Sequence, residues 1–175
     1  ELNNQTIDLI WSGYSKTEER ATRVAFSQPY LTNHQMIVSM KQNPVNRLAD
    51  LKGQNLGVQT GSSGMAQLDR KPAVLKQKIA NQTPILYDTY NNAFIDLQAK
   101  RIKGILIDQV YANFEIKARA NGQDFQAIES PFAAEKFAVG MRPEDQKLRR
   151  FINRRYQVLK QNGQLAKIQA KWFKE

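Results

Sequence analysis

The sequence has 175 residues, enough for one domain or for two small lobes with a core. Its 41% hydrophobic and 24% charged residues are ordinary for a folded protein, and the absence of cysteine excludes disulfides, thiolate metal sites and a cysteine nucleophile. The chain has one histidine, His34, whereas a transition-metal site usually needs several His or Cys ligands and a Ser-His-Asp triad needs its histidine in the site. We therefore expect no metal and no other cofactor.

The net charge of +10 is concentrated near the C-terminus, since residues 142–175 contain ten Lys/Arg and three acidic residues, a net +7. A basic helix of this kind can bind nucleic acid or an anionic membrane, but a solvated helix face has the same composition. On a helical wheel the basic residues fall mostly apart from an apolar stripe that includes Phe151 and Leu159. We therefore favour the solvated face and expect no nucleic-acid binding.

No apolar run approaches the about 20 residues that span a bilayer. Residues 1–11, ELNNQTIDLIW, lack the basic start and long apolar stretch of a signal peptide. If the parent protein is exported, we expect that its signal peptide has been removed. Both a cytosolic and an exported bacterial protein stay compatible with the composition.

The first third of the chain predicts short elements separated by turn residues. Residues 6–11 form a β-rich run that ends at Ser12-Gly13, which predicts a strand and a turn. Thr17 precedes two acidic residues and predicts the N-cap of a helix, which must be brief because Pro29 lies ahead. Next we expect a strand at 34–41, one turn of helix, a turn at Gly53, a strand at 55–59 and a Gly/Ser loop at 60–64.

Strands and helices alternate through the rest of the chain. The run at 102–108 is almost entirely apolar, as expected of a parallel strand buried on both faces. This alternation predicts an α/β protein with a largely parallel sheet, and no repeat or flexible linker divides the chain. The other predicted elements are a helix from 65 that Pro72 interrupts, strands at 83–88, 125–130 and 136–142, helices at 91–101 and at 109–120 with its end near Asn121-Gly122, and two C-terminal helices separated at Gly163.

Two loops bring glycine and hydroxyl residues to the carboxyl end of a predicted strand, where ligands bind in open α/β sheets. These loops are residues 12–15 and 60–64. Backbone N–H groups at a following helix, together with hydroxyl groups, suit a carboxylate or a phosphate, and Arg20 can add a bidentate contact. Neither loop is a Walker or a GxGxxG motif, and a Gly/Ser turn taken alone is more often only a turn.

Asp108, at the end of the predicted buried strand, is the third element of a possible site. It can bind an ammonium group or cap the following helix, and spacing alone favours neither. Taken together, the two loops and Asp108 offer donors for an anion and an acceptor for a cation. This is the set that a free amino acid requires, because its backbone is a zwitterion.

Four motifs carry a resemblance that runs along the entire chain. The sequence resembles the polar-amino-acid family of solute-binding proteins, the extracytoplasmic receptors of ABC importers. The motifs lie in the order of that family, and four in register are far more specific than any one of them. They are IDLIWSGYSKTEERATRVAFSQPY (7–30), RLADLKGQNLGVQTGSSG (47–64), AFIDLQAKRIKGILIDQVYA (93–112) and LKQNGQLAKIQAKWF (159–173).

The resemblance implies a periplasmic-binding-protein-like α/β fold of type II, with two lobes of mixed, mostly parallel sheets and a hinge that lets them close around a ligand. Lobe one is expected at residues 1–37 with 136–175, and lobe two at 38–135. The family normally has about another half-lobe before residue 7, so we expect lobe one to be partial. A sheet that lacks strands exposes apolar edges, which leads us to expect a homo-oligomer formed by exchange of elements.

The resemblance also implies contacts to a ligand, carried over residue by residue, while Thr17 is left as a helix cap. The expected ligand-binding residues are Gly13, Ser15 and Arg20 with Ser62 and Ser63 for the α-carboxylate, Asp108 for the α-amino group, and Gln59 for the ligand side chain.

The implied partners are a free polar amino acid and the membrane permease of an ABC transporter. The implied location is the periplasm or, in a Gram-positive organism, the cell surface as a lipoprotein, and no catalysis is implied. Two other functions stay open. One is an enzyme on the same scaffold, similar to cyclohexadienyl dehydratase, which needs a general acid for which Asp108 is the only clear candidate; the other is the ligand-sensing domain of a receptor.

Overall fold

The computed structural model describes residues 1–119 and 122–172, and the chain divides into two compact units. The first unit is Glu1–Thr32 with Glu135–Glu175, and the second unit is Asn33–Ala134. We propose these units as the two lobes expected from the sequence. The expected boundary at 37/38 falls inside a strand of the second unit, so we place the first boundary earlier.

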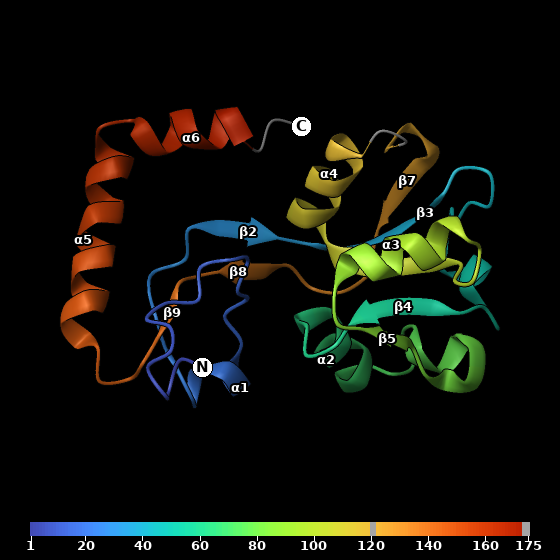
Figure 1. The fold of residues 1–175 in the computed structure, drawn as a ribbon, viewed down its shortest axis with the longest axis horizontal. Helices are drawn as coiled ribbons and strands as arrows, with labels where there is room; N and C mark the ends of the chain where they lie inside the picture. The colour runs from blue at the N-terminus through green and yellow to red at the C-terminus, as the bar shows by residue number, and fades with distance from the viewer. Residues whose placement is uncertain (120–121, 173–175) are drawn as a thin grey trace. The chain divides into compact units, whose positions relative to one another are not determined.

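The second unit contains a five-stranded sheet in the order β5-β4-β6-β3-β7 (Figure 1). β4 pairs in parallel with β5 and β6, whereas β3 pairs antiparallel with β6 and β7. The prediction of a mixed, mostly parallel sheet is confirmed, because β5, β4, β6 and β7 run in one direction and β3 runs in the other. The strands are β3 (Gln35–Met40), β4 (Leu56–Gln59), β5 (Ile85–Tyr87), β6 (Gly104–Asp108) and β7 (Phe125–Glu129).

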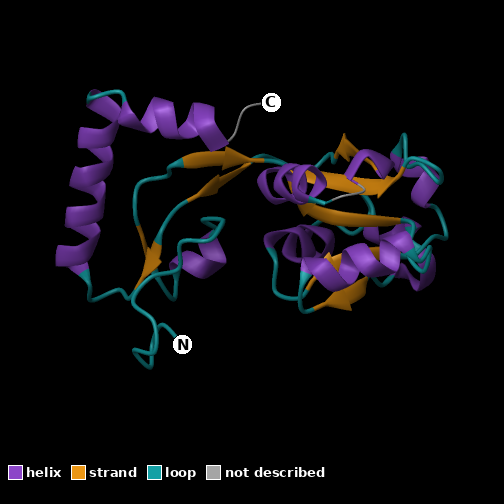
Figure 2. Cartoon of the chain, turned by 45° about the horizontal axis from the view of Figure 1, so that its top comes forward, coloured by secondary structure: helices purple, strands orange, loops and turns teal. Residues whose placement is uncertain are grey.

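Helices cover both faces of this sheet (Figure 2). In β6, Ile105 and Ile107 pack against one cluster with α3 and α4, while Leu106 packs against the other with α2, so the strand is buried on both faces as predicted. The helix predicted from residue 65 ends at Arg70, because Pro72 follows. The helices are α2 (Ser63–Arg70), α3 (Tyr90–Gln98) and α4 (Gln109–Ala118), with short 3₁₀ helices η1 (Leu48–Leu51), η2 (Lys76–Lys78), η3 (Ala80–Gln82) and η4 (Gly122–Asp124).

The predicted end of the 109–120 helix at Asn121 lies outside the described residues, although α4 itself is confirmed. The strands predicted at 34–41, 55–59, 83–88, 102–108 and 125–130 and the helix at 91–101 are also confirmed, with no end shifted by more than three residues.

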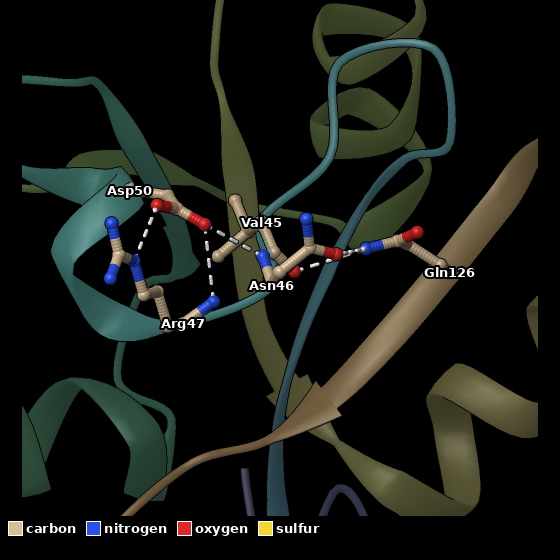
Figure 3. Close-up of polar contacts among 5 residues, drawn as sticks. All are labelled: Val45, Asn46, Arg47, Asp50 and Gln126. Atoms are coloured by element: carbon tan, nitrogen blue, oxygen red, sulfur yellow. Dashed lines mark hydrogen bonds and ion pairs between the residues drawn. The ribbon is translucent and has the colours of Figure 1, made fainter.

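A polar cluster fixes the loop between β3 and β4 (Figure 3). The Asp50 carboxylate accepts hydrogen bonds from the backbone N–H groups of Asn46 at 2.9 Å and Arg47 at 3.2 Å. Gln126 of β7 donates through Nε2 to the carbonyl oxygen of Val45 at 3.0 Å and to Asn46 Oδ1 at 3.1 Å. These contacts hold the first turn of η1 and tie the loop to the neighbouring strand.

The strands of the first unit have only two or three residues each. β1 pairs with β9 and β2 with β8, each as a two-stranded sheet. The strand predicted at 6–11 is wrong, because only Ile10 finds a partner, in a bridge to Gly140. The strand predicted at 136–142 is split in two, because its halves pair with different strands. The elements are α1 (Glu18–Ala21), β1 (Ala25–Phe26), β2 (Leu31–Asn33), β8 (Glu135–Phe137), β9 (Gly140–Met141), α5 (Gln146–Gln161) and α6 (Gln164–Trp172).

The two C-terminal helices are confirmed, with Gly163 at φ +76° between them. Within the first unit, α5 contacts the loop at Gln28 through polar residues. The backbone N–H of Gln28 donates to Asn153 Oδ1 at 2.8 Å, and Gln157 donates to the Gln28 side chain. Phe151 and Leu159, on the apolar stripe, are exposed. No helix of the described residues combines the length and apolar character needed to cross a bilayer.

Candidate functional site

The turn at residues 12–15 has a backbone that favours glycine. Gly13 has φ +71°, in the left-handed region, and a Cβ added there would lie 3.4 Å from the ring of Phe137. Next to it, Ser15 forms a bridge to Phe137 of β8, with the N–H of Lys16 donating to the carbonyl of Lys136 at 2.8 Å. The turn is therefore held against β8 of the same unit.

Ser15 is buried and its hydroxyl donates to Glu135 Oε2 at 2.6 Å. No local sequence pattern predicts this pair, because the two residues lie 120 positions apart. The contact places a carboxylate directly beside a residue expected to bind the carboxylate of a ligand. A ligand carboxylate that accepts the hydrogen bond from the Ser15 hydroxyl must therefore replace Glu135 as the acceptor.

Arg20 lies at the last turn of α1, whose N-cap is the predicted Thr17: Thr17 Oγ1 accepts from the Arg20 N–H at 3.1 Å. The Arg20 guanidinium donates through Nη1 to the carbonyl oxygen of Ser15 at 2.9 Å. Its Cζ lies 4.4 Å from the centre of the Tyr14 ring, within range of a cation–π contact. The structure thus brings Gly13, Ser15 and Arg20 together in the first unit.

Tyr30 lies beside this turn. Burial raises the pKa of the Tyr30 phenol, and a hydrogen bond with the backbone of Gly13 opposes that shift without cancelling it. The phenol therefore stays neutral at physiological pH and adds no charge to the cluster around Arg20.

In the second unit, the Gly/Ser loop leads directly into α2. Gly61 has φ +68°, and Ser62 is the N-cap of α2, with its Oγ accepting from the Met65 N–H at 3.1 Å. A hydroxyl that accepts through oxygen keeps its hydrogen for donation, so capping does not exclude a ligand contact. Ser63, the first residue of the helix, is buried.

Asp108 occupies the N-cap position of α4, but its side chain makes no capping hydrogen bond. Its Oδ1 instead accepts from two amides, Asn33 Nδ2 at 2.6 Å and Gln35 Nε2 at 2.8 Å. Of the two interpretations that the spacing left open, the side-chain cap is wrong. The carboxylate is held by side chains of β2 and β3.

Gln35 also reaches the Gly/Ser loop, because the same Nε2 donates to Ser63 Oγ at 3.2 Å. One amide thus links two residues that the sequence singled out, Asp108 and Ser63. Gln35 was not predicted as a site residue, although an uncharged polar residue at the start of a largely apolar strand was a usable signal.

Gln59, at the end of β4, donates through Nε2 to the carbonyl oxygen of Asp88 at 3.0 Å. This bond holds its side chain at the loop after β5. The His34 side chain takes no part in these contacts: its Nδ1 lies 3.0 Å from Glu129 Oε1, with the histidine half-buried and the glutamate exposed.

The whole chain, residues 1–175, matches the model of the bacterial extracellular solute-binding proteins, family 3. It is 31% identical to ABC transporter arginine-binding protein 1 of Escherichia coli (strain K12), over 98% of this chain and 68% of that protein. It is 28% identical to the arginine-binding extracellular protein ArtP of Bacillus subtilis (strain 168), over 98% and 65%. The chain spans about two thirds of the length of these relatives.

Solved structures of amino-acid-binding proteins are similar to this chain in fold. A substrate-binding protein of an ABC uptake transporter from Streptococcus pneumoniae, solved with bound histidine, matches with a TM-score of 0.93 and 43% identity, over 99% of this chain and 71% of that one. The arginine-, lysine-, histidine-binding protein ArtJ from Geobacillus stearothermophilus matches with a TM-score of 0.85 and 25% identity, over 98% and 72%.

Proposed function

The chain belongs to family 3 of the bacterial extracellular solute-binding proteins, and on that basis we propose that it is the substrate-binding component of an ABC importer for amino acids. Its fold is the type II fold of periplasmic binding proteins. The relatives above are named as binding proteins of transport systems, which supports a binding role and not an enzymatic one.

The contact network of Asp108, Gln35 and Ser63 carries this proposal. It puts a carboxylate and a hydroxyl on one buried amide, and the carboxylate is held by hydrogen-bond donors instead of capping a helix. A free amino acid has one cationic and one anionic group on the same carbon. We assign Asp108 to its ammonium group and Ser63, with Ser62, to its carboxylate.

The first unit supplies the remaining contacts to the carboxylate in this proposal. Arg20 provides the positive charge, and the left-handed turn at Gly13 brings the backbone and Ser15 next to it. A guanidinium presents its N–H donors in a planar fork whose geometry suits a carboxylate. We further propose that the ligand carboxylate competes with Glu135 for the Ser15 hydroxyl.

Arginine and histidine are the first candidate ligands, because the similar proteins are named for these amino acids or hold one of them. Gln59 is our candidate for contact with the ligand side chain. Its amide is tied to the Asp88 carbonyl by one bond, which leaves the amide oxygen as an acceptor for a cationic or N–H-bearing side chain.

A thermal-shift screen of the twenty amino acids, followed by calorimetry, tests the function directly. We expect L-arginine or L-histidine to raise the melting temperature and to bind with one site per chain. Spermidine, a cation without a carboxylate, is the control and should give no shift. The absence of a shift with all twenty amino acids would contradict the proposal.

We also propose a location, a membrane partner and an oligomeric state for the protein. We place the protein outside the cytoplasm as its family implies, either free in a periplasm or lipid-anchored at a cell surface, with an ABC permease as partner. The homo-oligomer expected from the sequence is tested by light scattering after size-exclusion chromatography. A monomer at all concentrations would reject it.

The dehydratase alternative makes a different use of Asp108. A general acid must donate a proton, whereas the two hydrogen bonds of Asp108 Oδ1 to Asn33 and Gln35 use this oxygen as an acceptor. We therefore propose no catalysis, and turnover of prephenate or arogenate would overturn that choice.

A further inference from the structure

We propose that Gln35 is a positioning residue that fixes the spacing between Asp108 and Ser63 and thereby restricts the ligand to α-amino acids. This inference rests on the proposed function, because it takes Asp108 as the acceptor for the ligand ammonium group and Ser63 as a donor to the ligand carboxylate. Neither the sequence motifs nor the residues expected from the family include Gln35.

The backbone places Gln35 directly beside Asp108. The two residues are Cα partners in the antiparallel pair of β3 and β6, so their side chains leave the sheet on the same face. The carbonyl oxygen of Gln35 accepts from the Ser130 N–H at 2.9 Å, which anchors this end of the strand on its other side. The position of the amide therefore follows from the sheet itself.

The side chain of Gln35 is fully buried and uses one nitrogen for two bonds. A primary amide has two N–H hydrogens. In Gln35, Nε2 donates to Asp108 Oδ1 at 2.8 Å and to Ser63 Oγ at 3.2 Å. Because both oxygens bond to the same nitrogen, they lie at most about 6 Å apart, and neither can move without breaking a bond to Gln35.

This coupling matters for the ligand. In an α-amino acid one carbon separates the ammonium group from the carboxylate, whereas a β-amino acid has two. An acceptor and a donor held at fixed spacing can pair with both the ammonium group and the carboxylate of an α-amino acid. With a β-amino acid they can pair with only one of the two groups. A group left unpaired in such a site costs the full desolvation penalty, which makes the fixed spacing selective.

Gly64 leaves room for the Gln35 amide. A Cβ added to Gly64 would lie 2.8 Å from Gln35 Oε1 and 3.4 Å from Leu106 Cδ2. The first of these distances is too short for a real Cβ, so any other residue at position 64 must displace the amide. Gly64→Ala therefore offers a second way to disturb Gln35 without changing its chemistry.

Asn33 supplies the matched control. It is buried like Gln35 and also donates to Asp108 Oδ1, at 2.6 Å, but its Nδ2 donates to Asp108 and not to Ser63. Replacing either amide removes a hydrogen bond to the same carboxylate oxygen. Only the replacement of Gln35 also uncouples Asp108 from Ser63.

The test measures the affinity of four proteins for L-arginine and L-β-homoarginine by calorimetry, and repeats it with L-histidine and L-β-homohistidine. We expect Gln35→Met and Asn33→Leu each to weaken binding of the α-amino acid about 10- to 100-fold, as loss of a hydrogen bond to a charged group does. We expect Gln35→Met and Gly64→Ala to narrow the α-to-β affinity ratio by at least about 5-fold, and Asn33→Leu to leave it unchanged.

The outcomes separate this inference from the function on which it rests. If the unmodified protein binds none of the amino acids, the proposed function fails, and the role of Gln35 fails with it. If the unmodified protein binds but Gln35→Met and Asn33→Leu change the ratio equally, the function stands and the positioning role is wrong. Gly64→Ala decides in the same way if Gln35→Met does not fold.

Discussion

The two units of the molecule hold the polar groups of the proposed site in place in different ways. In the second unit a five-stranded sheet, buried on both faces, carries Gln35 and Asp108 on adjacent strands. In the first unit the strands have two or three residues, no residue of α5 or α6 in the described range is buried, and the turn around Gly13 depends on contacts with β8. Paired strands therefore position the polar groups of the second unit, whereas individual contacts position those of the first unit.

The largest expected contrast concerns stability. Phe94 of α3 is fully buried and meets Phe125 edge to face at 5.2 Å, so Phe94→Ala should cost about 3–5 kcal/mol in the free energy of unfolding. Phe151 of α5 is 54% exposed, and Phe151→Ala should cost less than about 1 kcal/mol. Urea unfolding monitored by circular dichroism measures both. Equal losses would show that the difference in burial does not govern stability.

The next contrast lies in binding. Arg20→Ala should weaken binding of the amino acid by about 2–5 kcal/mol, because it leaves the ligand carboxylate without its charged partner. Arg101→Ala is the control, since Arg101 forms an exposed ion pair with Asp96 in the second unit. Calorimetry on both variants checks this. An Arg20→Ala protein that binds as tightly as the unmodified protein would remove Arg20 from the site.

Helix caps sharpen the comparison at a smaller scale. Thr17 caps a helix of four residues and Ser62 one of eight, and both accept a backbone N–H at 3.1 Å. Each change to alanine should cost about 1 kcal/mol in unfolding free energy. Ser62→Ala should also weaken amino-acid binding, whereas Thr17→Ala should not. A loss of affinity in Thr17→Ala as large as in Ser62→Ala would contradict the assignment of Thr17 as a cap alone.

The smallest expected effect is on pH dependence. The backbone N–H of Asn46, helped by Arg47, holds the pKa of Asp50 below its ordinary value of 3.8. Because the folded-state pKa is lowered, Asp50 contributes stability above the unfolded-state value, and that contribution is lost as the pH falls through the folded-state value. Melting curves should therefore show a steeper loss of stability below pH 3.8 for the unmodified protein than for Asp50→Asn. Equal slopes in the unmodified protein and in Asp50→Asn would contradict this role of Asp50.

What could be predicted from the sequence follows the same division between the units. The almost entirely apolar run at 102–108 predicted a buried strand, and the alternation of strands and helices predicted the α/β architecture of the second unit. A short apolar run of this kind is typical of a strand that is buried on both faces. Residues 6–11 look equally like a strand, but a strand needs a continuous partner, and only Ile10 has one. A local pattern cannot report whether a partner strand exists.

The candidate site divides in the same way. Thr17 was found because it precedes acidic residues, Ser62 because it lies in a Gly/Ser loop, and Asp108 because it ends an apolar run. Glu135 and Gln35 were missed because each acts through a contact made far along the sequence, to Ser15 and to Ser63 and Asp108. Such contacts appear only once the strands are paired.

The most direct test of the account is calorimetric titration of L-arginine and L-histidine into the unmodified protein and into Asp108→Ala. The account predicts binding of at least one of them at one site per chain, weakened by about 2–5 kcal/mol when Asp108 no longer pairs with the ammonium group. Binding of equal affinity in the two proteins would contradict it.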